Sequence, residues 1–216
     1  MPQATTEPAA LGFSCHSGWA IAVAVTGSPT APIVLERRRI EIRDTAIPGS
    51  KQPFHAAETL PFNQAEALIR RCQESSTRLA KQEVAALAIG IIQRGFHFTC
   101  AGIVFASGRM LPGLASILKS HALIHTAEGE FFRQILVEAC EHCELPVTRV
   151  KQREIWETAA DAFRIPLEEL QQQISGLRRT LGPPWSSDEK LASIAAWMAL
   201  ECNGTELRHS KTRLAV

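Results

Sequence analysis

The sequence lacks an excess of charge of either sign. Its 216 residues include 23 Lys and Arg against 22 Asp and Glu, which gives a formal net charge of +1. A protein that binds nucleic acid through the phosphate backbone usually carries a clear basic excess. The composition therefore weakens a nucleic-acid interpretation and leaves only a local basic patch as a route to that function.

Long hydrophobic runs are also missing. The longest apolar stretch, residues 19–25, has the length of a strand and is too short to cross a membrane. The first residues lack the basic and apolar regions of a secretory signal. The six cysteines are scattered, so we expect reduced thiols rather than a disulfide framework. A glycine-rich phosphate loop is absent too. These absences predict a soluble cytoplasmic protein without a membrane partner.

What is present is the apolar patterning of an α/β domain. With 45% hydrophobic residues, the chain is long enough for one sizeable core. We assign this domain to residues 10–205, between a flexible leader (1–9) and a polar tail (206–216). Three apolar segments with short turns between them predict a meander of antiparallel strands. They span residues 11–15, 18–26 and 32–43.

Helices and strands alternate in the remainder of the chain. Three prolines make residues 44–61 a loop, and a long helix is predicted from Asn63, as its N-cap, to Gly95. A strand over residues 85–92 is the alternative, because apolar runs of that length are ambiguous. Strands are then predicted at 96–106 and 146–150, and helices within 114–143 and at 152–163, 167–177 and 187–201. This order predicts a five-stranded mixed sheet with helices on its faces.

Three segments resemble the ribonuclease H-like superfamily and, within it, the Holliday-junction resolvases of the RuvC type. LGFSCHSGWAIAVAV (11–25) resembles the family's first hairpin, whose first strand ends in a catalytic aspartate. Residues 125–160 resemble its central helix, fifth strand and following helix. SSDEKLASIAAWMAL (186–200) resembles the last helix, which presents aspartates. The resemblance implies a ribonuclease H-like three-layer fold with extra C-terminal helices and, in active members, a nuclease site that holds two divalent metals.

Most carboxylates of such a site are missing. The resemblance places the strand-one aspartate at Ser14 or Cys15, and the strand-four acid at Ala106 or Ser107, or near position 90 if the long helix is split. Asp188 is the one acidic candidate that remains, and it alone cannot hold two cations. We therefore expect the two-metal nuclease chemistry to be lost, while another divalent metal site stays open.

One helix face groups polar residues with chemical potential. His121, His125 and Glu128 have offsets i, i+4 and i+7, so on a continuous helix they share a face with apolar residues. Two imidazoles and a carboxylate at this spacing suit zinc. The interpretation we favour is a hydrogen-bonded network that caps the helix and orients its entry loop. Glu130 and Arg133 are either a surface pair or part of a rebuilt site around HTAEGE (125–130).

Asp188 and the arginines of the third strand each have two interpretations. Asp188 lies inside a capping box formed by Ser186 and Glu189, and we favour a role in the helix cap over a catalytic one. Arg37 and Arg39 lie on one face of their strand. They would either follow a phosphate backbone or protect an edge strand from pairing with another molecule.

Two further motifs are interpreted as structural or are discarded. Cys140 and Cys143 form a lone CxxC without the second pair that a structural zinc site requires, and both continue an apolar helix face. We therefore expect them to pack in the core. His16 and Ser17 are neighbours on an extended segment, so their side chains point to opposite faces and cannot form a nucleophile–base pair.

Three hypotheses for function follow. The first is a catalytically degenerate nuclease relative that binds nucleic acid or a protein. The second is a metal-assisted hydrolase with a rebuilt site, and the third is a homo-oligomeric structural protein, for which a homodimer is the simplest form. The candidate catalytic residues are Glu128, Glu130 and Asp188. The candidate binding residues are His125, Arg133, Arg37 and Arg39, and the candidate metal ligands are His121, His125 and Glu128.

Overall fold

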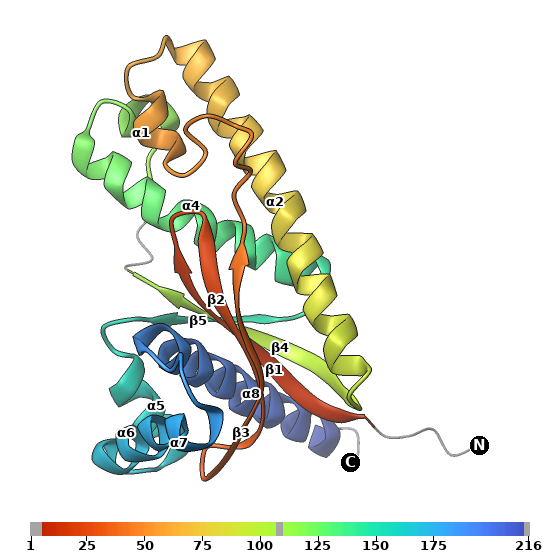
Figure 1. Ribbon diagram of the computed structural model, residues 1–216. Coiled ribbons are helices and arrows are strands. Elements are labelled where there is room, and N and C mark those ends of the chain that lie inside the picture. The colour runs from red at the N-terminus through yellow and green to blue at the C-terminus, as the bar shows by residue number, and fades with distance from the viewer. Residues whose placement is uncertain (1–5, 107–109, 214–216) are drawn as a thin grey trace.

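A five-stranded mixed sheet forms the centre of the molecule in the computed structural model, which describes residues 6–106 and 110–213, with side chains described up to residue 203 (Figure 1). The strands are β1 (Glu7–His16), β2 (Trp19–Ser28), β3 (Ala31–Glu41), β4 (Phe96–Phe105) and β5 (Val147–Lys151). Their order is β3-β2-β1-β4-β5. β2 runs antiparallel to β1 and β3, whereas β4 runs parallel to β1 and β5. This topology confirms the predicted α/β fold with a five-stranded mixed sheet of three antiparallel strands followed by parallel ones.

Helices cover both faces of the sheet (Figure 1). α2 (Phe62–Ile92) and α4 (His121–His142) pack on one face, and α5 (Ile155–Phe163), α6 (Leu167–Gly176) and α8 (Ser187–Arg213) pack on the other. The short helices are α1 (Pro53–Ala57), α3 (Leu114–Ile117) and α7 (Arg178–Leu181). Alternate residues of β1 and β2 enter the two cores, because successive side chains of a strand point to opposite faces. The central strands are therefore apolar on both sides.

α8 lies unusually close to the sheet. A Cβ atom added at Gly12 of β1 would collide with the carbonyl oxygen of Ala192, and one added at Gly102 of β4 would collide with that of Ala195. Glycine is required at both positions because the helix backbone occupies the space that a side chain would fill. This contact fixes the N-terminal end of α8, with Asp188, beside the carboxyl end of β1.

Several boundaries differ from those predicted. α2 begins at Phe62 with Pro61 as its N-cap residue, rather than with Asn63, whose side chain bonds only to the neighbouring Gln64 N–H. The alternative strand over 85–92 is wrong, because α2 continues through it to Ile92. The burial of one α2 face along its whole length supplies the tertiary contacts that decide this ambiguous apolar run.

Ordered structure also extends into segments predicted to be irregular. The loop over 44–61 contains α1, which starts with Pro53 at a position where proline's missing N–H costs nothing. β1 includes residues 7–9 of the predicted leader, because Glu7 N–H donates to Gly95 O and the strand pairs with β4 from there. α8 continues beyond residue 201. Within the described part of the chain, no helix is long and apolar enough to cross a membrane.

Candidate functional site

The carboxyl end of β1 carries a small polar cluster, which we call the β1-end cluster: Ser14, His16 and Asp188. The Ser14 hydroxyl donates to Asp188 Oδ1 at 2.7 Å, and His16 Nε2 lies 2.9 Å from the same oxygen. Ser14 is buried, whereas His16 is exposed. Serine and histidine each contact the carboxylate and not each other, so this is not the Ser–His–Asp relay of a hydrolase.

Sequence reasoning missed the role of His16. It was considered only with Ser17, although the alternation of a strand places His16 on the same face as Ser14. That period of two was the signal that could have found the pair. Asp188 also keeps its predicted place in the helix cap: Ser186 N–H and Oγ both bond to Glu189 Oε2, at 2.7 and 2.5 Å, and Asp188 N–H donates to Ser186 Oγ at 3.2 Å.

Arg133 of α4 places a fixed positive charge near the ends of β1 and β4. Its Nε donates to Val104 O at 3.1 Å, and it also donates to Gly129 O. Burial raises the pKa of the Cys15 thiol to about 12, with Arg133 opposing this rise and Glu130 adding to it. Both side chains are therefore close enough to influence Cys15 at the end of β1. Their roles in binding and catalysis stay predictions.

Glu130 lines a cavity of about 320 Å³ together with Phe105, Phe131 and Arg149. Arg149 lies over the Phe105 ring, with its guanidinium carbon 5.2 Å from the ring centre. Among the described residues, Glu130 has no ion pair with Arg133, so the surface pair considered from the sequence is not formed. Ser107, which was considered as the end of the fourth strand, lies outside the described residues.

The side chain of Glu128, on α4, accepts hydrogen bonds from the N-terminal end of α1. Its Oε1 accepts the backbone N–H groups of Phe54 at 2.7 Å and His55 at 3.0 Å, and lies 3.3 Å from His55 Nδ1. Burial raises the pKa of Glu128, and the backbone hydrogen bond from His55 is the largest opposing cause. The second oxygen, Oε2, is buried without a hydrogen-bond partner among the described residues. Glu128 therefore takes part in a capping network, but the cap serves α1 rather than α4.

Three histidines lie close together, one of them in contact with Glu128. His121 and His125 of α4 meet His55 of α1, and the three can offer ligand nitrogens that all lie within 4.8 Å of one another. His121 Nε2 and His125 Nε2 are 3.1 Å apart. We call these residues the three-histidine cluster. His55 was missed because it lies in a proline-rich segment far away in sequence, where a single histidine gives no signal before the fold is known.

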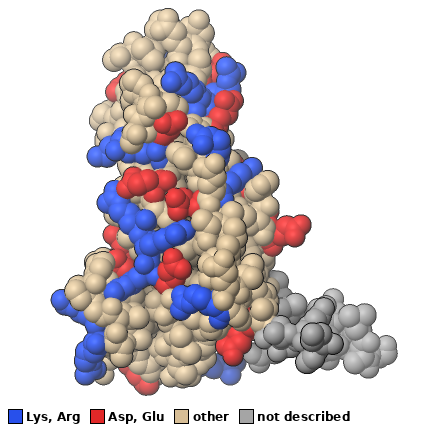
Figure 2. All heavy atoms as spheres, turned by 45° about the vertical axis from the view of Figure 1, so that its right-hand side comes forward, with Lys and Arg blue, Asp and Glu red and all other residues tan. Residues whose placement is uncertain are grey.

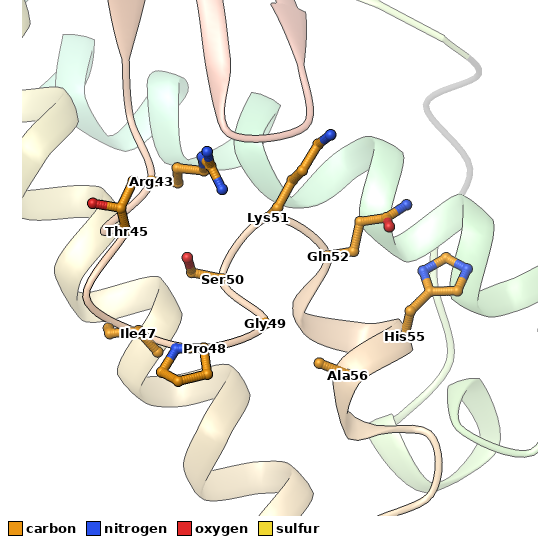
Figure 3. A pocket seen from close by; sticks show the side chains of 10 residues that line it. All are labelled: Arg43, Thr45, Ile47, Pro48, Gly49, Ser50, Lys51, Gln52, His55 and Ala56. Carbon is orange, nitrogen blue, oxygen red and sulfur yellow. The ribbon is translucent and has the colours of Figure 1, made fainter.

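His55 also borders a polar cavity of about 460 Å³ formed by the β3–α1 connection and α1 (Figure 3). Arg43, Thr45, Ser50, Lys51 and Gln52 line it as well. Arg43 packs against the turn at Gly18, where φ is +87° and a Cβ would touch the arginine side chain. Among the described residues, neither Arg43 nor Lys51 forms an ion pair with a carboxylate. The cavity therefore presents two uncompensated positive charges.

The two candidate arginines of β3 have different environments. Arg37 donates to the carbonyl oxygens of Leu181 at 2.6 Å, Gly182 at 3.0 Å and Pro183 at 3.3 Å, and also to that of Pro184. These bonds attach β3 to the segment between α7 and α8. A role of Arg37 in binding a ligand stays a prediction.

Arg39 belongs to a stack on the surface. Its Nε pairs with Glu41 Oε1 at 2.7 Å, and its guanidinium carbon lies 4.0 Å from the centre of the Trp19 ring. His16 stacks on the same indole with ring centres 4.1 Å apart and planes inclined by 10°. Trp19 thus connects Arg39 with the β1-end cluster.

No family model matches this chain. No curated protein matches it. Among solved structures, the Thermus thermophilus RuvC in complex with a Holliday junction substrate is similar with a TM-score of 0.48 at 10% identity, over 90% of this chain and 94% of that chain. A second structure of Thermus thermophilus RuvC is similar with a TM-score of 0.46 at 11% identity, over 92% of this chain and 96% of that chain.

The remaining motifs match their structural interpretation. Cys140 is buried, Cys143 packs beside it against the same core, and burial raises the pKa of both thiols. None of the six cysteines, all of which lie in the described segments, forms a disulfide. On the face shown in Figure 2, acidic and basic side chains lie interspersed rather than in one basic field.

Proposed function

We propose that this chain is a nucleic-acid-binding module of ribonuclease H-like fold that does not cleave its ligand by two-metal chemistry. The observation that carries the proposal is the polar cavity beside the β1–β2 turn, where Arg43 and Lys51 form no ion pair with any carboxylate of the described residues. Arginine binds phosphate through a planar fork of donors, and lysine binds it as a point charge. Two such cations in the lining of one cavity suit a phosphodiester better than a neutral ligand.

The stack next to this cavity offers the second component of single-strand recognition. Bases stack on exposed aromatic and guanidinium surfaces, at about 1–3 kcal/mol per base. His16 lies flat on Trp19 and keeps 42% of its side chain exposed, so its outer surface is accessible to a base. Arg39 covers the same indole. Phosphate contacts from Arg43 and stacking on His16 would thus meet at the β1–β2 turn.

The absence of cleavage is supported by the β1-end cluster. A two-metal site needs several carboxylates to offset the charge of the ions. Here the end of β1 offers the Ser14 hydroxyl, and the Oδ1 atom of Asp188 already accepts that hydroxyl while contacting His16. Arg133 adds a cation of its own nearby. The Glu130 carboxylate also acts on the end of β1, so the negative charge near the cluster is that of two carboxylates, partly offset by Arg133, which is little for two divalent cations.

A single titration tests binding and cleavage together. Labelled four-way junction, duplex and single-stranded DNA would be titrated at two salt concentrations with Mg²⁺, with anisotropy reporting binding and a gel of the same samples reporting cleavage. We expect affinity that weakens with salt, because phosphate contacts release counterions. The double variant Arg43→Gln/Lys51→Gln should lower the salt dependence by about 1–2 in the log–log slope.

Arg178→Gln is the matched control, because Arg178 is an exposed arginine on α7, at the opposite end of the molecule from α1 in Figure 1. It should leave the salt slope unchanged. Metal-dependent cleavage that disappears in Asp188→Ala would refute the non-cleaving assignment. Absence of DNA binding in a dimer whose mass does not change with concentration would instead support the homo-oligomeric structural protein.

A second candidate function, a metal-assisted hydrolase, is favoured by one observation, the three-histidine cluster. Three imidazoles with an open position are a ligand set that activates water on zinc in known enzymes. This candidate requires a bound metal first. Its chemistry would lie at α1 and α4 rather than at the β1-end cluster.

A further inference from the structure

We propose that the three-histidine cluster is a mononuclear transition-metal site, with His55, His121 and His125 as protein ligands and zinc as the ion it fits best. The inference does not rest on the proposed nucleic-acid binding. It rests on the convergence of three imidazoles from two separate elements and on the carboxylates behind two of them.

The spacing of the ring nitrogens is close to that of a coordinated ion. Zinc binds histidine nitrogen at about 2.0–2.1 Å, which in a tetrahedral site separates two ligand nitrogens by about 3.3 Å. The Nε2 atoms of His121 and His125 are 3.1 Å apart, as two histidines at i and i+4 on α4 permit. The third ligand nitrogen lies within 4.8 Å of both, so a small rotation of the rings closes the triangle.

The nitrogens that face away from the cluster have acidic partners. His55 Nδ1 lies 3.3 Å from Glu128 Oε1, and His121 Nδ1 lies 3.6 Å from Glu58 Oε1. His121 then offers Nε2, which contacts His125 Nε2, and the proposed site takes Nε2 of His55 as its third donor. Histidines that bind metals usually donate their other ring N–H to a carboxylate, which fixes the tautomer and orients the ring. Glu128 and Glu58 are therefore positioning residues, and Glu128, a candidate metal ligand from the sequence, acts through His55.

Two carboxylates next to the cluster favour a cation at this place, although the N-terminus of α4 opposes it. A divalent ion beside the first turn of α4 would face the positive end of that helix, which is unfavourable. Glu58 and Glu128 supply two negative charges against it. The Glu128 side chain is buried, with a relative exposure of 5%, and its Oε2 has no hydrogen-bond partner among the described residues. An ion held by His55 would compensate this buried carboxylate.

The donor set selects the kind of metal. Imidazole suits zinc, copper, nickel and iron, whereas Mg²⁺ and Ca²⁺ require oxygen ligands. Three protein ligands leave a fourth tetrahedral position for water, as in catalytic rather than structural zinc sites. His121 keeps 65% of its side chain exposed, so that position is open to solvent. The site would be distinct from a two-metal nuclease centre in both its ligands and its location.

The competing explanation is a hydrogen bond between two neutral imidazoles, one donating and one accepting across the 3.1 Å Nε2–Nε2 contact. It needs no metal. Under this explanation, replacing Glu58 would have no effect on metal binding. Metal binding by the full-length protein separates the two explanations without any assay of activity.

The experiment is a titration of the chelator-treated full chain with Zn²⁺ by calorimetry and with Co²⁺ by visible absorption. We expect one ion per chain and the intense Co²⁺ bands of tetrahedral coordination. Loss of an outer carboxylate costs about 10–100-fold in affinity. Glu58→Gln should weaken binding within that range, and loss of a ligand in His125→Ala or His121→Gln should weaken it by more than about 100-fold.

His142→Ala is the matched control, since His142 is an exposed histidine at the other end of α4. It should bind one ion with unchanged affinity. No stoichiometric ion in the parent protein would overturn the inference. So would equal losses in His125→Ala and His142→Ala, because they would show unspecific binding by surface imidazoles. Both ligands on α4 are exposed, so these variants are expected to fold, and circular dichroism verifies it.

Discussion

Replacing Arg37 with glutamine tests whether this arginine is a structural link or a ligand-binding residue. Its guanidinium donates to consecutive backbone carbonyls between α7 and α8, among them Leu181 O at 2.6 Å and Gly182 O at 3.0 Å. It also lies 5.8 Å from the centre of the Trp185 ring. The substitution removes the charge and all of these contacts together.

The magnitude follows from these contacts. A hydrogen bond to a charged group contributes about 1.5–3 kcal/mol, and the lower value applies because Arg37 is only half-buried. Two such bonds and a weak cation–π contact of about 0.5 kcal/mol give a loss of about 3.5 kcal/mol in the free energy of unfolding. For a domain of this size, that corresponds to a fall in Tm of roughly 7–14 °C.

Urea and thermal unfolding followed by circular dichroism would measure the effect, with Arg39→Gln as the control. Arg39 is exposed and paired with Glu41, so its replacement should cost less than about 1 kcal/mol. Equal stability of the two variants would refute the structural assignment of Arg37. Weaker DNA binding by Arg37→Gln at unchanged Tm would show instead that the phosphate-binding interpretation of its strand is right.

Three further predictions concern packing, charge and thiol chemistry. Gly12→Ala should lower the free energy of unfolding by about 1–3 kcal/mol or more, measured by urea unfolding, because the added methyl meets the α8 backbone. A hydrogen bond from Ser75 and one from the Ala46 N–H hold the pKa of Asp44 below its ordinary value, so stability from this group is present above that value and lost as pH falls through the lowered pKa. Ser75→Ala should raise the Asp44 pKa in a carboxyl NMR titration, and an unchanged value would contradict the assignment. Exposed Cys202 should react with a thiol reagent at neutral pH well before buried Cys15, whose pKa is about 12, and equal rates in mass spectrometry would argue against this core.

The sheet could be predicted from the sequence because its signals are local. The alanine–valine alternation in β2 marks a strand covered on both sides, and the order of strands and helices restricts the topology. α1 could not be predicted, since its few residues sit among prolines and its N-terminus is stabilised by Glu128 from a distant helix. A helix of five residues has too little intrinsic helix propensity to be recognised from the sequence.

The candidate site was predictable only where residues share an element. His121 and His125 were grouped because four residues on a helix bring side chains together. His55 and His16 were missed as partners because their contacts, with α4 and with α8, cross the fold. For Glu128 the residue was recognised but its target was not: the sequence cannot show that its Oε1 accepts hydrogen bonds from α1. The metal and binding assignments of these residues stay predictions.

The position of β1 at the centre of the sheet has a consequence for synthesis. β1 leaves the ribosome before its parallel neighbour β4, which begins only at Phe96, and before the helix that packs on Gly12, which begins at Ser187. Until α8 has been made, the nascent β1–β2 hairpin therefore lacks cover on the apolar face that α8 buries. Contacts of such high sequence separation slow folding and expose strand edges to association. A chain interrupted before α8 should consequently accumulate in aggregates or on chaperones, whereas a chain that includes α8 can cover this face.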